Sequence, residues 1–172
     1  MNTVKLKDIS IGNKGSYGIG ASAYKCEPSS PQYLRITDIS DDSRINIPLP
    51  ACINVDEYPK YKNYFLNEND IVFARTGNST GRNYFHNGSP DKIVYAGYLI
   101  KFSIDSSKIN PRYVGYYCQS NSYWKQVKSL FTGSTRSNLN AIMYGELNIP
   151  ILETSKQQQI VNIILILPLI YL

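Results

Sequence analysis

The residues best suited to chemistry in this sequence form a polar loop from Arg75 to Arg82. Two arginines bracket four short hydrogen-bonding side chains, which are Thr76, Asn78, Ser79 and Thr80. Glycines at 77 and 81 let the backbone of such a loop approach a surface closely. Arginine can pair with guanine, asparagine with adenine, and hydroxyls with bases or phosphates. The loop is therefore a candidate nucleic-acid contact, and an ordinary hydrophilic hairpin loop is the alternative.

A second loop, residues 132–138, has the same character and follows a segment that carries two lysines. Two such loops make contact with a DNA groove or backbone more credible than either loop alone. Beyond the first loop, the candidate DNA contacts are Lys14, Tyr17, Arg35, Lys125, Lys128, Ser134, Arg136 and Asn138.

The distribution of charge points in the same direction. The chain has a net charge of +5, yet no acidic residue lies between Asp105 and Glu146, or from Ile71 to Pro90. Basic residues in acid-poor stretches suit a phosphate backbone, because their binding releases counterions. Many basic proteins bind no nucleic acid, so charge alone is only suggestive.

Residues for catalysis or metal binding are scarce. His86 is the single histidine, and no neighbour in the sequence would orient it as a general base. Glu68, Asp70 and Lys92 could surround Mg²⁺ in a nuclease, but the segment 67–70 is more typical of a turn before a strand. We therefore predict a non-catalytic protein with no metal site and no cofactor of its own.

The three cysteines, Cys26, Cys52 and Cys118, are far apart and form no CxxC or Cys/His pair. This pattern supports neither a disulfide framework nor a zinc knuckle. We expect reduced, buried thiols in a cytoplasmic protein. The N-terminus lacks the apolar region of a signal peptide, and the apolar run 160–172 is too short to span a bilayer as a helix.

The elements that must position these loops follow from periodicity and caps. Strands are predicted at Tyr33–Ile39, Ile71–Ala74 and Ile93–Ile104, with a further β-like stretch over 139–151. One or two exposed helical turns are expected over 56–63. A glycine-rich loop at 12–20 does not match a nucleotide-binding pattern.

Helices are predicted towards the C-terminus. Asn110-Pro111 is a typical helix start, and Ser120-Asn121 is a possible break between two helices. Thr154-x-x-Gln157 has the spacing of a capping box, and Pro168 should end or kink the last helix. The prediction is an α+β domain with a mixed or antiparallel sheet over residues 1–152, followed by a short helix over 153–172.

Five segments in order resemble one known family. They are Tyr33–Ile39, Asn69–Gly81, Tyr95–Phe102, Gly133–Asn140 and Leu147–Leu152 with the following Gln157–Val161. Together they resemble the target recognition domain of the specificity subunit of bacterial type I restriction–modification systems. The resemblance covers Val4 to about Ile164, and no single motif is decisive.

The resemblance implies a non-catalytic subunit that recognises one half of a bipartite double-stranded DNA target. Two methyltransferase subunits would dock on it, and S-adenosylmethionine would be bound by those partners alone. A separate ATP-driven restriction subunit would join the complex indirectly. The loop from Arg75 to Arg82 would lie on the DNA-facing side, without base-specific roles for single residues.

The chain departs from the family in two ways. It holds one recognition domain, although family subunits usually hold two. Its last helix continues into the apolar run 164–172, as in a truncated spacer helix, instead of showing charged heptads. Ile160, Ile163, Ile164 and Leu167 should therefore contact another subunit or a second copy of the chain.

Two alternatives stay open at this point. The chain could be the recognition portion of a fused restriction–methylation enzyme, or a truncated subunit that acts only as a protein-interaction module.

Overall fold

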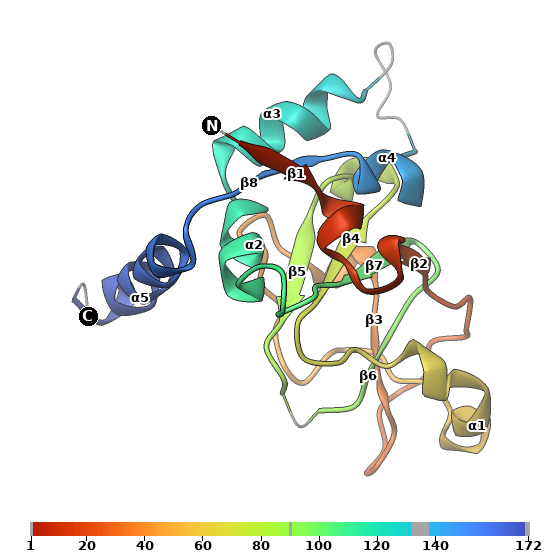
Figure 1. Cartoon of the computed structure of the whole chain (residues 1–172). Coiled ribbons are helices and arrows are strands. Elements are labelled where there is room, and N and C mark those ends of the chain that lie inside the picture. The colour runs from red at the N-terminus through yellow and green to blue at the C-terminus, as the bar shows by residue number, and fades with distance from the viewer. Residues whose placement is uncertain (1, 90, 132–137, 171–172) are drawn as a thin grey trace.

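The computed structural model describes residues 2–89, 91–131 and 138–170. Its centre is a four-stranded antiparallel sheet in the order β2-β7-β4-β5 (Figure 1). These strands are β2 (Ser16–Tyr17), β4 (Asp70–Ala74), β5 (Asn83–His86) and β7 (Leu99–Ser103). The apolar β4 is buried along its whole length, because it lies between two strands and is covered on both faces.

Two strand pairs flank this sheet. β1 (Thr3–Lys5) pairs antiparallel with β8 (Asn148–Pro150), which brings the two ends of the folded body together. β3 (Gln32–Leu34) pairs in parallel with β6 (Ile93–Tyr95). The predicted α+β class with mixed and antiparallel strands is confirmed.

The α-helices are α1 (Tyr58–Tyr61), α2 (Pro111–Tyr117), α3 (Asn121–Ser129), α4 (Ala141–Gly145) and α5 (Thr154–Ile170). Short 3₁₀ helices span Leu6–Ile9, Ile11–Asn13, Ile36–Asp38, Val55–Glu57, Lys62–Tyr64 and Gly77–Ser79. The side chains of Asn110, Ser120 and Asn140 accept backbone N–H groups at the starts of α2, α3 and α4. The predicted helix start at Asn110 and the break at Ser120 are confirmed.

The largest core cluster lies where these helices meet the central sheet. Phe73 of β4 stacks on Tyr144 of α4 with ring centroids 4.9 Å apart. It also meets Phe102 edge-on at 5.9 Å and Tyr123 of α3 at 6.1 Å. Aromatic rings of β4, β7, α3 and α4 thus join the end of β4 to the helices.

Three predicted strands differ in the structure. The run from Ile93 to Ile104 divides into β6 and β7 at a turn over 97–98. The strand predicted at Tyr33–Ile39 ends at Leu34, and a 3₁₀ helix follows. The stretch 139–151 contains α4 before β8, since Asn140 caps a helix there. The helical turns expected over 56–63 are confirmed, although Tyr61 within them is buried.

The last helix differs from the prediction in two respects. α5 does not end at Pro168 but continues to Ile170, since the missing N–H of a proline removes one hydrogen bond and leaves those of the preceding turns in place. Gln157 makes no capping box. Its side chain donates to Leu152 O at 2.7 Å and accepts from Asn110 N at 2.9 Å, so it joins α5 to the start of α2.

The cysteines also differ from the prediction. Cys26 and Cys52 form a disulfide with their Cα atoms 5.0 Å apart, whereas Cys118 is free and buried. The backbones of Tyr24 and Cys52 exchange two hydrogen bonds, which align these segments. A pairing set by contacts across 26 residues cannot be found from the spacing of cysteines alone.

Candidate nucleic-acid interface

The loop from Arg75 to Arg82 is closed at its base by backbone hydrogen bonds. Gly81 N donates to Ala74 O at 3.0 Å, and Ala74 N donates to Arg82 O at 2.8 Å. Two buried phenols reinforce this closure. Tyr144 donates to Ala74 O and Tyr123 donates to Gly81 O, both at 2.6 Å. Burial raises the pKa of both phenols, so they stay protonated and keep these bonds.

Arg75 meets Tyr17 at the start of this loop. The guanidinium carbon lies 5.1 Å from the centroid of the Tyr17 ring, within cation–π range. The Tyr17 hydroxyl accepts from Ala141 N at 3.1 Å, and Leu139 N donates to Arg75 O at 2.9 Å. The exposed Asn138 precedes Leu139, so Tyr17, Arg75 and Asn138 come from three distant segments to one edge.

Lys14 extends this edge. It is exposed and lines a shallow cavity of about 280 Å³ with Ala141 and Ile142. We call Lys14, Tyr17, Arg75 and Asn138 the loop edge. It joins four predicted site residues, and their positions follow from β2, the end of β4 and the start of α4.

The two predicted lysines of α3 lie close to the same loop. Trp124 and Val127 face Gly81 so closely that a Cβ on this glycine would lie 2.6 Å and 2.8 Å from their atoms. Lys125 and Lys128 are exposed on α3. The helix therefore packs on the loop with its apolar side and presents both cations to solvent.

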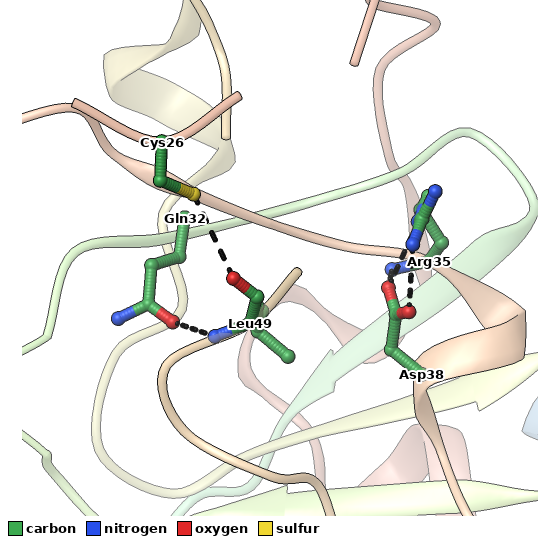
Figure 2. Close-up of polar contacts among 5 residues, drawn as sticks. All are labelled: Cys26, Gln32, Arg35, Asp38 and Leu49. Atoms are coloured by element: carbon green, nitrogen blue, oxygen red, sulfur yellow. Dashed lines mark hydrogen bonds and ion pairs between the residues drawn. The ribbon is translucent and has the colours of Figure 1, made fainter. Parts of the chain in front are cut away.

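Two predicted arginines are instead held in ion pairs. Arg82 contacts Asp41 through two nitrogens at 2.8 Å and donates to Ile39 O at 3.2 Å. Arg35 makes a two-pronged contact with Asp38 at 3.0 and 2.9 Å, as Figure 2 shows. This hydrogen bonding raises the pKa of Arg35. The structure does not bring either guanidinium into the loop edge.

Further contacts join β3 and the segment before it to residues 49–52. Leu49 N donates to the Gln32 side chain at 2.6 Å, and Cys26 Sγ lies 3.6 Å from Leu49 O (Figure 2). Because that sulfur is bonded to Cys52, it has no proton to donate, and the approach is a contact only. The extended segment before β3 is thus attached to residues 49–52.

Other predicted loop residues differ in exposure. Ser79 and Thr80 are buried, and the Thr80 hydroxyl donates to Gly77 O at 2.8 Å, so they shape the loop from inside. Asn78 is exposed and Thr76 is half-buried. The predicted contacts Ser134 and Arg136 lie outside the described residues.

Sequence reasoning missed Tyr98 at the loop edge. It was assigned to a continuous strand, but it lies in the turn between β6 and β7, is 62% exposed, and accepts from Arg75 N through its carbonyl at 3.0 Å. The adjacent Ala96-Gly97 was the only signal of a turn, since glycine weakens a strand.

Two of the residues weighed for catalysis, Asp70 and His86, are buried in the structure. Asp70 is buried and accepts from Asn67 N at 2.8 Å, with Lys101 Nζ 3.0 Å away and Ser103 also donating to it. His86 is buried and burial lowers its pKa. Among the described residues no cluster of three or more His, Cys, Asp or Glu side chains could hold a metal ion.

The predicted interface residues of α5 divide between two faces. Ile160 packs against the core and Ile164 is half-buried. Ile163 and Leu167 are 58% and 43% exposed, and Ile166 beside them is 51% exposed. An apolar face of α5 is therefore uncovered. Within the described ranges, no helix is both long and apolar enough to cross a membrane.

Comparisons with known proteins identify one family. A family model described as the type I restriction modification DNA specificity domain matches residues 1–167. A search of curated proteins finds no match.

Three solved structures have a similar fold. The HsdS subunit of Thermoanaerobacter tengcongensis superposes with a TM-score of 0.67 at 14% identity, covering 96% of this chain and 41% of that one. A structure described by complex assembly and conformational transition of the type I R-M system gives 0.66 at 10% identity, covering 97% and 42%. The S subunit of M. genitalium gives 0.62 at 14% identity, covering 94% and 37%. The chain thus spans about two fifths of the chains it matches.

Proposed function

Because the chain belongs to the family of type I restriction modification DNA specificity domains, we propose that it recognises a DNA sequence for a restriction–modification complex. The observation that carries this proposal is the family match over nearly the whole chain. The loop edge supports it, because it groups cationic and hydrogen-bonding side chains from separate segments on one exposed margin.

In the finer form of the proposal, the chain reads one half of a bipartite double-stranded target. Residues 1–152 form the recognition domain, and residues 153–172 form a spacer helix that docks partners. The chain is non-catalytic and cytoplasmic, and it has no cofactor of its own. A methyltransferase partner supplies S-adenosylmethionine, and the restriction subunit associates indirectly.

Selection from a pool of random duplexes tests recognition. We expect the 172-residue chain to enrich one short motif, and each changed base pair in it to weaken binding by about 1–3 kcal/mol. Measured affinity should fall steeply with salt. Binding without any enriched motif would contradict sequence recognition, and the absence of salt-dependent DNA binding would favour a pure interaction module.

The same assay with a methyltransferase subunit tests docking. We expect the partner to add methylation at the selected motif, whereas the chain alone should methylate nothing when S-adenosylmethionine is supplied. Methyl transfer by the chain alone would contradict the non-catalytic assignment and favour the fused-enzyme alternative.

The uncovered face of α5 supports a second contact, either with a partner subunit or with another copy of the chain. Ile163 and Ile166 are exposed on it, and exposed apolar patches commonly mark interaction sites. We expect dimers by light scattering at tens of micromolar, and monomers after Ile163→Glu with Ile166→Glu. Ser155→Glu with Gln159→Glu, at two exposed positions of the same helix, is the control for two added charges. A monomeric parent chain would refute self-association.

A further inference from the structure

The position of Arg75 is fixed through its backbone on both sides. Its N–H donates to Tyr98 O at 3.0 Å, and its carbonyl accepts from Leu139 N at 2.9 Å. These partners lie in the β6–β7 turn and in the segment before α4. Segments distant in the sequence thus determine where the Arg75 side chain begins and which way it points.

The side chain is also held at its far end. The guanidinium lies over the Tyr17 ring at 5.1 Å. That ring is itself fixed, because Tyr17 pairs with Ile100 in the sheet and its hydroxyl accepts from Ala141 N at 3.1 Å. A guanidinium stacked on a fixed ring loses less side-chain entropy when it binds a ligand than a mobile one would.

The charge of this guanidinium is not neutralised. In the described part of the chain, no carboxylate forms an ion pair with Arg75, and its buried Nε has no acceptor. Arg35 and Arg82, in contrast, are paired with Asp38 and Asp41. Arg75 is only half-buried, and charged donors bind anionic oxygens more strongly than neutral ones, so a ligand that brings such oxygens would gain from meeting the guanidinium.

The adjacent loop leaves room for such a ligand. Gly77 has a φ of 65°, and a Cβ on it would meet no atom within 4 Å. Asn78 next to it is exposed. Among the described residues, none therefore crowds Gly77 and Asn78, which follow Arg75 closely in the loop.

We propose that Arg75 binds a phosphate of the DNA backbone and thereby sets the register of the domain on the duplex, with Tyr17 as its positioning residue. A phosphate supplies the negative charge and the paired oxygens that Arg75 lacks, whereas a base edge is neutral. The inference rests on the proposed function. It assigns to Arg75 a contact that is independent of sequence, so that other residues of the loops must read the bases.

The test measures affinity against salt concentration for the selected duplex and for a scrambled one. We expect Arg75→Ala to weaken binding to both duplexes by a similar factor, roughly 10- to 100-fold. The slope of log affinity against log salt should become shallower by about 0.9. The affinity of Arg75→Lys for DNA should lie between those of the parent chain and Arg75→Ala. Lys62→Ala, an equal change of charge in the exposed 3₁₀ helix after α1, is the matched control and should change little.

Tyr17 is tested by coupling. Tyr17→Leu should weaken binding in the parent chain and have almost no further effect when combined with Arg75→Ala, because it acts through the arginine. Far-UV circular dichroism and thermal unfolding establish that each variant folds. Equal effects of Tyr17→Leu in both backgrounds would refute the positioning role.

Repeating the random-duplex selection with Arg75→Ala separates this inference from the proposed function. The same motif at lower affinity supports the phosphate contact. A motif relaxed at one position would show that Arg75 reads a base, which overturns the inference and leaves sequence recognition intact. If the parent chain enriches no motif, sequence recognition is contradicted. The difference in salt dependence between the parent chain and Arg75→Ala then still tests the phosphate contact.

Discussion

Gly81 is where the loop from Arg75 to Arg82 meets α3, and Gly81→Ala tests how closely the two are packed. This residue has a φ of 94°, and a Cβ on it would lie 2.6 Å from Trp124 Cζ3 and 2.8 Å from Val127 Cγ1. Gly77 in the same loop also has a positive φ, of 65°, but a Cβ on it would meet nothing within 4 Å. Gly77→Ala is therefore a matched control that carries backbone strain without a steric clash.

The expected magnitudes follow from these two contributions. Placing alanine at positive φ costs about 1–2 kcal/mol, which both variants share. Overpacking against Trp124 and Val127 adds about 1–3 kcal/mol in Gly81→Ala alone. For a domain of this size each kcal/mol lowers the melting temperature by about 2–4 °C. Gly81→Ala should therefore melt roughly 2–12 °C below Gly77→Ala.

Thermal unfolding followed by circular dichroism gives this difference directly. Trp124 is the only tryptophan in the chain, so its fluorescence reports the contact with Gly81 without a label. We expect a changed emission spectrum in folded Gly81→Ala and an unchanged one in Gly77→Ala. Equal melting temperatures with identical spectra would refute the close packing of α3 on the loop.

Two further predictions concern titration and thiols. Burial lowers the pKa of His86 from 6.5, so the unfolded chain binds a proton at this residue more readily, and the stability of the fold decreases as the pH drops through about 6.5. The urea midpoint should therefore fall more between about pH 7 and about pH 5.5 in the parent chain than in His86→Asn. An equal fall in both proteins would contradict the burial of His86. Without reductant, thiol titration should find no reactive cysteine in the folded chain, because Cys118 is buried and burial raises its pKa. It should find one reactive cysteine after denaturation, and three after denaturation and reduction. Three reactive thiols in the unreduced, denatured chain would exclude the Cys26–Cys52 disulfide.

Features encoded by neighbours in the sequence were predicted well. Asn110 and Ser120 cap their helices through backbone groups two or three residues away, and the apolar run from Ile71 to Ala74 forms most of a buried strand. The break between β6 and β7 was missed, because Tyr98 in the turn and the apolar residues on either side of it are typical of a strand.

The candidate site was harder to predict, because the environment of a polar side chain depends on distant residues. Arg75 and Arg82 bracket one loop and look equivalent in the sequence, yet within the described ranges only Arg82 reaches a carboxylate, that of Asp41. Arg75 instead meets Tyr17, which lies 58 positions earlier by the difference in numbering. Composition identified the loop, but only tertiary contacts distinguish its free cation from its paired one.

The pairing of β1 with β8 has a mechanical consequence. Thr3 lies opposite Pro150, and Ile151 N donates to Asn2 O at 2.9 Å. Asn2 and Ile151 therefore lie at the same end of the β1–β8 pair. A force that pulls the chain apart at residues 2 and 151 would open the three facing residue pairs one after another, as in unzipping. β4 lies between β5 and β7 and would bear no load until that ladder had opened. Force applied at residues 2 and 151 would thus separate β1 from β8 before it reached β4, the strand that ends one residue before Arg75.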